Sequence, residues 1–302
     1  MTKEDRKIAY INKKIQKLSQ SYIVVVMPQG LGDILYFCLF LEDYRREHIG
    51  NKIAFIVTKK HFMDLAILYK HLIDKIIYID SSLLNKVDNS RFIYYYPQIY
   101  NENNPQEHLM HAVKQAIGVN INAIPYYPTI YVSQHEKWTI RKTISKPGKA
   151  ILISPEAVSC NVDITETEWI DLADTLKEKG MEVYFNTNKK NMYGSYPKVF
   201  FSLRKTLIFS HYAGYFIGFR SGLCDVVAAF SDCKQIVIYP NNKKIGEFPS
   251  IKNFDINPNK KYMDYCSLKT AFPDRAITEF IYENGQLLNM IGREFRDGED
   301  IS

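Results

Sequence analysis

The chain has few cysteines and no cysteine pair of the kind that binds metals or forms a redox centre. Its five cysteines are scattered over 302 residues without any Cys-x-x-Cys spacing, and some lie in apolar runs, so we expect reduced and mostly buried thiols. No apolar run approaches the roughly 20 residues of a membrane span, and the N-terminus leads into no signal-type apolar core. The sequence therefore predicts a cytoplasmic protein.

Familiar nucleotide-binding and metal-binding motifs are also absent. Neither half of the chain contains the Gly-x-Gly-x-x-Gly fingerprint of dinucleotide-binding folds, and no Gly-Lys-Ser/Thr follows a glycine-rich turn as it does in a P-loop. The missing fingerprint disfavours a nicotinamide-dependent oxidoreductase. No Asp-x-Asp pair lies in either of the two ligand-binding turns that the sequence suggests, so we predict no required divalent metal.

Long basic tracts are missing as well. A formal net charge of +6 over 302 residues favours an anionic small molecule or an anionic membrane surface over nucleic acid as the partner. The length exceeds that of most single domains, which predicts two domains. A charged, polar stretch at residues 133–149 precedes a new apolar strand, so we expect the domains to be residues 1–147 and 148–302.

The first half of the sequence alternates strand and helix patterns. Residues 1–20 have aliphatic side chains at three- and four-residue spacing and six basic residues against two acidic ones, which predicts a basic amphipathic helix. Docking on its own domain is the default interpretation of this helix, and a membrane-surface role is the alternative. Strands are predicted at residues 22–27, 52–58, 75–80 and 91–96, and helices at residues 34–41, 61–71 and 105–117.

A glycine-rich turn follows the first predicted strand. It contains Gly30 and Gly32, which let the backbone approach a ligand, and Asp33 at the start of the next helix. Doubly wound folds bind ligands at the carboxyl ends of their strands, which is where this turn lies. Asp33 is either an N-terminal cap of the helix or a carboxylate that removes a proton from a hydroxyl nucleophile.

The second half repeats this alternation. A strand at residues 150–154 ends in a loop that places Ser154 and Glu156 at another ligand-binding edge. A capping box at Thr165 and Glu168 begins a helix whose apolar stripe runs to Gly180. Further strands are predicted at residues 182–185 and 234–239, a helix at residues 202–213, and helical packing for residues 277–291.

Residues 215–230 combine a short buried strand, a tight turn and a helix of small residues. The start of a helix offers unpaired N–H groups and a partial positive charge, and Arg220, Ser221 and Gly222 can bring further donors or the backbone itself close to a phosphate. This turn therefore suits a nucleotide diphosphate. The alternative is that Arg220 pairs with an acidic residue, Ser221 caps the helix and Gly222 relieves crowding.

The order and spacing of these features resemble the heptosyltransferase-like glycosyltransferases of the GT-B fold, which transfer sugars from nucleotide diphosphates to bacterial envelope glycans. The resemblance covers most of the chain and rests on residues 30–33, 108–118, 153–158, 169–180 and 218–229. It implies an α/β fold with two Rossmann-like β/α/β domains that face each other across a cleft. The first would be the acceptor-side domain, and the second the nucleotide-sugar donor domain with C-terminal helices.

The resemblance also implies roles for single residues. Asp33 takes the position of the proposed catalytic base, and Ser221 and Gly222 take the position that holds the donor diphosphate. The chain departs from the family pattern at Asp225, where the family usually has histidine, and in the loop after residue 154, which lacks the usual lysine. Arg220 could supply the missing charge. The expected donor-binding set is Ser154, Glu156, Arg220, Ser221, Gly222 and Asp225, with Gly30 and Gly32 as the backbone of the first turn.

The leading hypothesis is an inverting, metal-independent glycosyltransferase that moves a sugar from a nucleotide-diphosphate sugar to a bacterial cell-envelope or capsular glycan. The nucleotide sugar is a co-substrate, and no other cofactor is expected. The acceptor would be a glycan or lipid-linked glycan, with peripheral contact to the inner face of the membrane. The alternative is a catalytically silent GT-B homologue that binds a sugar nucleotide or stabilises a partner transferase, and the altered lysine and histidine positions favour it.

Overall fold

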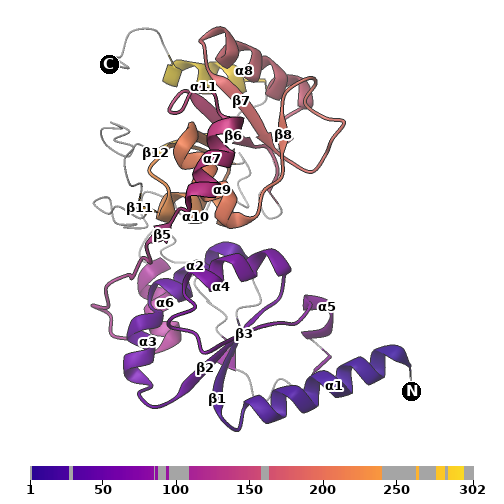
Figure 1. The fold of residues 1–302 in the computed structure, drawn as a ribbon, viewed down its shortest axis with the longest axis vertical. Coiled ribbons are helices and arrows are strands. Elements are labelled where there is room, and N and C mark those ends of the chain that lie inside the picture. The colour runs from indigo at the N-terminus through magenta and orange to yellow at the C-terminus, as the bar shows by residue number, and fades with distance from the viewer. Residues whose placement is uncertain are drawn as a thin grey trace. The chain divides into compact units, whose positions relative to one another are not determined.

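The chain forms two compact units, Met1–Pro128 and Thr129–Ser302, each built on its own parallel sheet (Figure 1). The structure is a computed structural model. It describes residues 2–26, 30–84, 86–87, 93–94, 109–157, 163–239, 263–264, 277–282 and 285–295.

The sheet of the first unit has four parallel strands in the order β3-β2-β1-β4. The side chains of β1 and β2 are buried on both faces over most of their length, as their continuous β-branched and apolar runs predict for a parallel sheet covered on both sides. Of the strand predicted at residues 91–96, the structure describes the two residues of β4. The strands are β1 (Tyr22–Val26), β2 (Lys52–Val57), β3 (Lys75–Tyr78) and β4 (Ile93–Tyr94).

The N-terminal helix α1 (Lys3–Leu18) docks on its own unit. Thr2 and Asp5 form a capping box at its start, and Ile15 and Leu18 are buried against side chains of β1, β2 and β3. The docking interpretation of this segment is therefore confirmed. The other helices of the unit are α2 (Leu31–Leu39), α3 (Leu41–Glu47), the 3-10 helix η1 (Lys60–Phe62), α4 (Met63–Leu68), α5 (Ser81–Leu84) and α6 (Leu109–Ile117).

The main sheet of the second unit has six parallel strands in the order β12-β10-β9-β6-β7-β8. Numbered along the chain from β6, this is the 3-2-1-4-5-6 order of the Rossmann fold. The strands are β6 (Ala150–Ser154), β7 (Glu182–Asn186), β8 (Lys198–Val199), β9 (Gly214–Phe219), β10 (Lys234–Tyr239) and β12 (Ile277–Ile281), and β5 (Ile130–Tyr131) pairs separately with β11 (Met263–Asp264).

One secondary-structure prediction in this unit is wrong. Residues 277–281, expected to be helical, form the edge strand β12, which runs parallel to β10 from Gln235 to Tyr239. The segment is rich in β-branched and aromatic side chains, which fit a half-buried sheet edge, and pairing with β10 outweighs its helical spacing. The helical part of the prediction holds for α11 (Leu287–Ile291).

Helices α8 (Glu166–Glu178) and α11 pack against the same core cluster as β6, β7, β9 and β10. The predicted capping box is present, because Thr165 accepts from Glu168 N–H and the Glu168 carboxylate accepts from Thr165 N–H. Among the described helices of both units, none is long and apolar enough to cross a membrane. The remaining helices of the second unit are α7 (Gln134–Thr143), α9 (Leu203–Ala213), α10 (Gly222–Phe230) and the 3-10 helix η3 (Gly292–Phe295).

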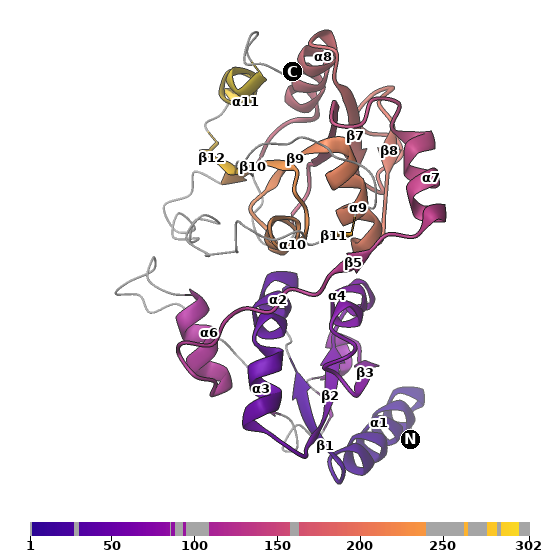
Figure 2. The ribbon, with the colours of Figure 1, turned by 60° about the vertical axis from the view of Figure 1, so that its left-hand side comes forward.

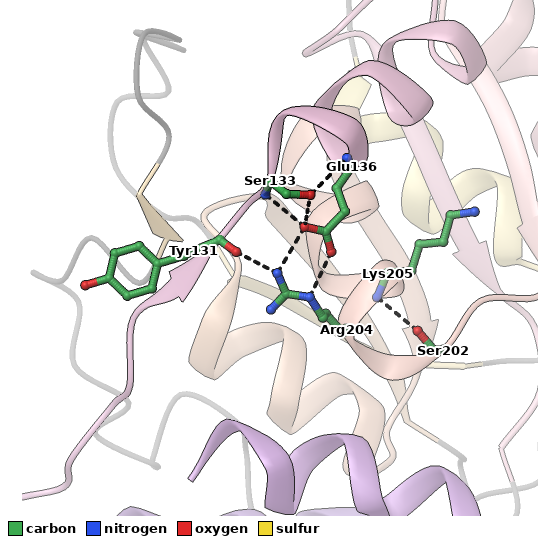
Figure 3. Close-up of polar contacts among 6 residues, drawn as sticks. All are labelled: Tyr131, Ser133, Glu136, Ser202, Arg204 and Lys205. Carbon is green, nitrogen blue, oxygen red and sulfur yellow. Dashed lines mark hydrogen bonds and ion pairs between the residues drawn. The ribbon is translucent and has the colours of Figure 1, made fainter. Parts of the chain in front are cut away.

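Helix α7 belongs to the second unit, although it precedes the boundary expected at residue 147. The Arg204 guanidinium on α9 donates to both carboxylate oxygens of Glu136 on α7, at 2.8 and 3.1 Å, and to the Tyr131 carbonyl at 2.6 Å (Figure 3). These contacts fix the segment after Pro128 to the second unit, so the division between the units lies upstream of the charged stretch that suggested it.

Cys38, Cys224 and Cys233 are buried free thiols. The expectation of reduced, buried cysteines is confirmed for these three. Cys160 and Cys266 lie outside the described residues.

Candidate functional site

The strand order of the second unit reverses between β6 and β9. From β6 the chain continues to β7 and β8 on one side, whereas β9, β10 and β12 lie on the other side. Ser154 at the end of β6 is in register with Gly218, next to the end of β9. Because both strands are parallel, the loops after Ser154 and Phe219 leave the same sheet edge. Open α/β sheets bind ligands at such a switch point.

Arg220 is buried within this edge rather than exposed on it. Its N–H donates to the Ile238 carbonyl at 2.8 Å, which extends the pairing of β9 with β10 by one residue. Its guanidinium lies 2.8 Å from the Asp225 carboxylate and donates to the Ser221 carbonyl at 3.2 Å. Both charged side chains are almost fully buried. The alternative prediction, that Arg220 pairs with an acidic residue, is therefore confirmed.

Ser221 is the N-cap residue of α10, but its side chain makes no capping hydrogen bond. Its hydroxyl instead lies 3.8 Å from the Cys224 sulfur, and the Cys224 thiol donates to the Phe219 carbonyl. Burial raises the pKa of Cys224 to about 12, so this thiol stays protonated at neutral pH. The alternative prediction, that the Ser221 side chain caps the helix, is therefore wrong. Ser221 and Gly222 are both partly exposed at the start of the helix.

Crowding at this turn involves a glycine that we did not predict as a site residue. A Cβ atom on Gly218 would lie 2.9 Å from Phe216 Cε1 and 3.5 Å from Cys224 Sγ. The missing side chain therefore leaves room for the Phe216 ring of the same strand, whereas the contact with Cys224 on α10 would be an ordinary one. The position of Gly218 within a strand is the sequence signal for such close packing.

The loop after β6 meets the end of β7. Ser154 is buried, whereas Glu156 is exposed, accepts from the Thr187 hydroxyl at 3.1 Å and pairs with Lys189 at 3.1 Å. At the end of β7, the buried Asn186 Oδ1 atom has no hydrogen-bond partner within the described part of the chain. Asn186 and Thr187 were not predicted as site residues, although the strand predicted at residues 182–185 places them at a ligand-binding edge. Residues 158–162, in the loop for which the resemblance led us to expect a lysine, lie outside the described residues.

In the first unit, Asp33 is the third residue of α2. Its carboxylate accepts a hydrogen bond from Gly30 N–H at 2.7 Å, which caps the first turn of α2, and its side chain is partly exposed. Gly32 is buried within the helix. The capping role expected for Asp33 is therefore present. At the end of β2, the buried Thr58 hydroxyl has no partner within the described part of the chain.

Among the described residues, no three His, Cys, Asp or Glu side chains are grouped to hold a metal ion. Metal independence stays a prediction, because this observation does not test the reaction.

Sequence comparison gives no relative: no protein-family model matches the chain, and no curated protein matches it significantly. Solved structures do match. The E. coli ADP-heptose LPS heptosyltransferase II aligns with a TM-score of 0.53 at 12% identity over 76% of this chain and 88% of its own. The E. coli heptosyltransferase WaaC, solved with ADP, has the same TM-score and identity over 90% of this chain and 99% of its own. A family 9 glycosyl transferase of Veillonella parvula gives 0.50 at 14% identity, over 94% and 91%. The expected fold is therefore confirmed: the chain has the two-domain, Rossmann-like GT-B fold of these heptosyltransferase structures.

Proposed function

We propose that the protein is a glycosyltransferase that takes its sugar from a nucleotide-diphosphate donor. The proposal rests on the start of α10, which lies at the switch point between β6 and β9. The Ser221 side chain makes no capping hydrogen bond to the first turn of this helix. The N–H groups and the dipole of a helix start attract a phosphate. Nucleotides bind at this position in doubly wound sheets.

Different residues at this edge bind different groups of the donor. The backbone of Ser221 and Gly222 binds the diphosphate and stabilises the negative charge that grows on it as the sugar leaves. Arg220 adds a fixed positive charge directly behind the turn, and Asp225 is a positioning residue that orients the guanidinium. Asn186 and Glu156, at the ends of the neighbouring strands, supply acceptors for the hydroxyl groups of the donor.

The base is Asp33, which deprotonates the acceptor hydroxyl so that this oxygen attacks the anomeric carbon and the nucleoside diphosphate departs. One attack from the face opposite the leaving group inverts the anomeric centre, and we propose that no metal ion is required. Two of the similar structures are named as heptosyltransferases, one of them with ADP bound. For this chain we propose the same broad class, with an envelope glycan or lipid-linked glycan as acceptor at the inner membrane face.

A panel of nucleotides tests the donor half of the proposal. We expect one of GDP, UDP, ADP, CMP and dTDP to raise the melting temperature of the whole chain, because a ligand that binds the native state stabilises it. At a nucleotide concentration about a hundredfold above Kd, the stabilisation is about 2.7 kcal/mol. A panel in which no nucleotide shifts the transition would contradict the donor site.

The chemical half is tested by Asp33→Asn in a transfer assay with the identified donor. The asparagine can still accept from Gly30 N–H, so the turn should fold while the general base is lost, and transfer should fall by about 10²–10⁴-fold with donor binding unchanged. Asp5→Asn is the matched control, because Asp5 accepts from Thr2 N–H in the same way at the start of α1. Undiminished transfer by Asp33→Asn removes Asp33 from the base role. Donor binding without any transfer by the wild type would identify a silent homologue.

A further inference from the structure

A groove lies between α1 and the edge of the first unit's sheet at β3. It encloses about 330 Å³, which is within the range of about 300–1,000 Å³ for small-molecule sites. Figure 2 shows α1 running beside this sheet, and the groove is lined from one side by α1 and from the other by residues 77–83. None of the residues that bind donor or acceptor in the proposed transfer lines it.

The floor of the groove is aliphatic. Its deepest lining residues are buried members of the core cluster beneath α1, and Ile11 lies partly buried above them. Such a floor offers no hydrogen bond to a sugar or a base, whereas a hydrocarbon chain can bury apolar surface on it. The floor consists of Ile11, Ile15, Leu18, Ile77, Ile79 and Leu83.

The rim of the groove is polar and carries excess positive charge. Lys7 and Lys14, two helical turns apart on α1, are exposed on it, and Tyr10 between them is 68% exposed. The lining carboxylate, Asp80, accepts three hydrogen bonds at 2.6–2.9 Å from Ser82 and Tyr78. These bonds, with a smaller contribution from the charge of Lys7, hold the pKa of Asp80 at about 2, so the carboxylate is ionised at neutral pH. Lys7 and Lys14 together still exceed this one carboxylate by a single positive charge, which favours an anionic head group above the aliphatic floor.

Docking of α1 limits how the helix can meet a membrane. Its apolar stripe packs on the sheet, so the helix cannot place that stripe in a bilayer while the unit is folded. The basic surface is still available, and lysines near an anionic bilayer contribute to binding individually. We propose that the groove binds one acyl chain of an anionic phospholipid at a bilayer surface, with Lys7 and Lys14 contacting the phosphate. This site does not depend on the proposed sugar transfer.

Vesicle flotation with the full chain tests the proposal. We expect binding to vesicles of phosphatidylglycerol and phosphatidylcholine in equal parts, and little binding to phosphatidylcholine alone. The double variant Lys7→Gln, Lys14→Gln should weaken binding about 25-fold, since each lysine near an anionic surface contributes about fivefold. The matched control is Lys13→Gln, Lys17→Gln, which removes the same charge from exposed positions of the same helix that do not line the groove.

A second pair of variants separates the groove from simple charge attraction. Ile8 and Ile11 are both partly buried against the core, but only Ile11 lines the groove. Ile11→Trp should fill the groove and weaken vesicle binding at least fivefold, whereas Ile8→Trp should not, and far-UV circular dichroism and thermal melting check that both fold. The proposal is overturned by a wild type that does not float, by equal losses in the two lysine variants, or by unchanged binding of a folded Ile11→Trp protein.

Discussion

Arg220 and Asp225 form a buried ion pair beside the proposed diphosphate site at Ser221 and Gly222. Removing two charges from water is costly, and their attraction offsets that cost only while both partners are present. Truncating one partner leaves the other charge buried and uncompensated. A variant of Arg220 alone therefore changes stability as well as phosphate binding, and the two effects have to be measured separately.

We predict that Arg220→Ala destabilises the chain by about 3–5 kcal/mol, because Asp225 then lacks its counter-charge. The double variant Arg220→Ala, Asp225→Ala should recover a large part of this loss. Urea unfolding of the four proteins in this cycle measures the coupling. Additive losses would mean that the pair is not coupled in solution.

The double variant also isolates the role of Arg220 toward the donor. Since it restores stability without restoring the guanidinium, it should still bind the nucleotide more weakly than the wild type, whereas an unaltered affinity rejects the phosphate role. Asp225→Asn keeps the shape of the side chain and tests whether orientation of Arg220 depends on the negative charge.

For single residues, the sequence predicted which side chains lie at the ligand-binding edges but not their ion-pair and hydrogen-bond partners. Ser154 and Arg220 were expected at strand ends, and Asp33 at the start of the helix after the first strand, because the apolar runs before them are clear. The pairing of Arg220 with Asp225 could not be derived in the same way, because a separation of five residues across a strand–helix turn does not by itself predict a contact. The orientation of Ser221 away from the capping position is likewise decided by the packing of Cys224.

Helix α7 is attached to its unit by charge-assisted hydrogen bonds as well as by the buried side chain of Ile140. Glu136 closes the capping box of α7 with Ser133 and accepts both bonds from Arg204 (Figure 3). Hydrogen bonds from Arg204, followed by those from Ser133, lower the pKa of Glu136 to about 2. Its ordinary value in the unfolded chain is near 4.5, so folding favours the charged form. The stabilisation is therefore complete above about pH 4.5 and is lost as the pH falls toward 2.

We predict that Glu136→Gln lowers the free energy of unfolding at pH 7 by about 1 kcal/mol, a value reduced for the partial exposure of both side chains. The variant should also flatten the fall in stability between pH 4.5 and pH 2. Chemical unfolding at several pH values measures both the loss of unfolding free energy at pH 7 and its change between pH 4.5 and pH 2. Glu178→Gln, at an exposed position near the end of α8, is the control and should keep the pH dependence of the wild type.

The elements themselves were largely predictable, and the exception has a physical cause. Strands buried on both faces, such as β6 and β10, and the capped helix α8 carry strong local signals. In β12, the apolar residues Ile277, Phe280 and Ile281 have spacings that fit either a helix or an edge strand. The choice is made by hydrogen bonds to β10, about 40 residues earlier in the chain, and such non-local pairing cannot be read from the segment alone.

For the whole molecule, the two units have separate cores. One core cluster lies beneath α1 in the first unit, and another lies between the main sheet and helices α8 and α11 in the second. The only two tryptophans of the sequence, Trp138 and Trp169, are both in the second unit. Tryptophan emission therefore reports the unfolding of one unit, while far-UV circular dichroism reports both.

We predict that the two signals give different melting curves, because domains with their own cores unfold as separate cooperative units. The nucleotide identified by the panel should raise the transition seen by tryptophan emission, and a part of the dichroism change should stay at its original temperature. Coincident curves with and without nucleotide would contradict two independently unfolding units.

The β6–β9 pairing at the centre of the second sheet also has a consequence for synthesis of the protein. Ile151 and Ile153 of β6 leave the ribosome well before their partners in β9, since β7, β8 and α9 are made in between. At roughly 5–20 residues per second, this leaves several seconds in which an apolar strand has one unpaired edge. A nascent chain in that state is a target for chaperones and prone to self-association, so slowing translation after residue 154 should reduce the soluble yield more than slowing it after residue 219.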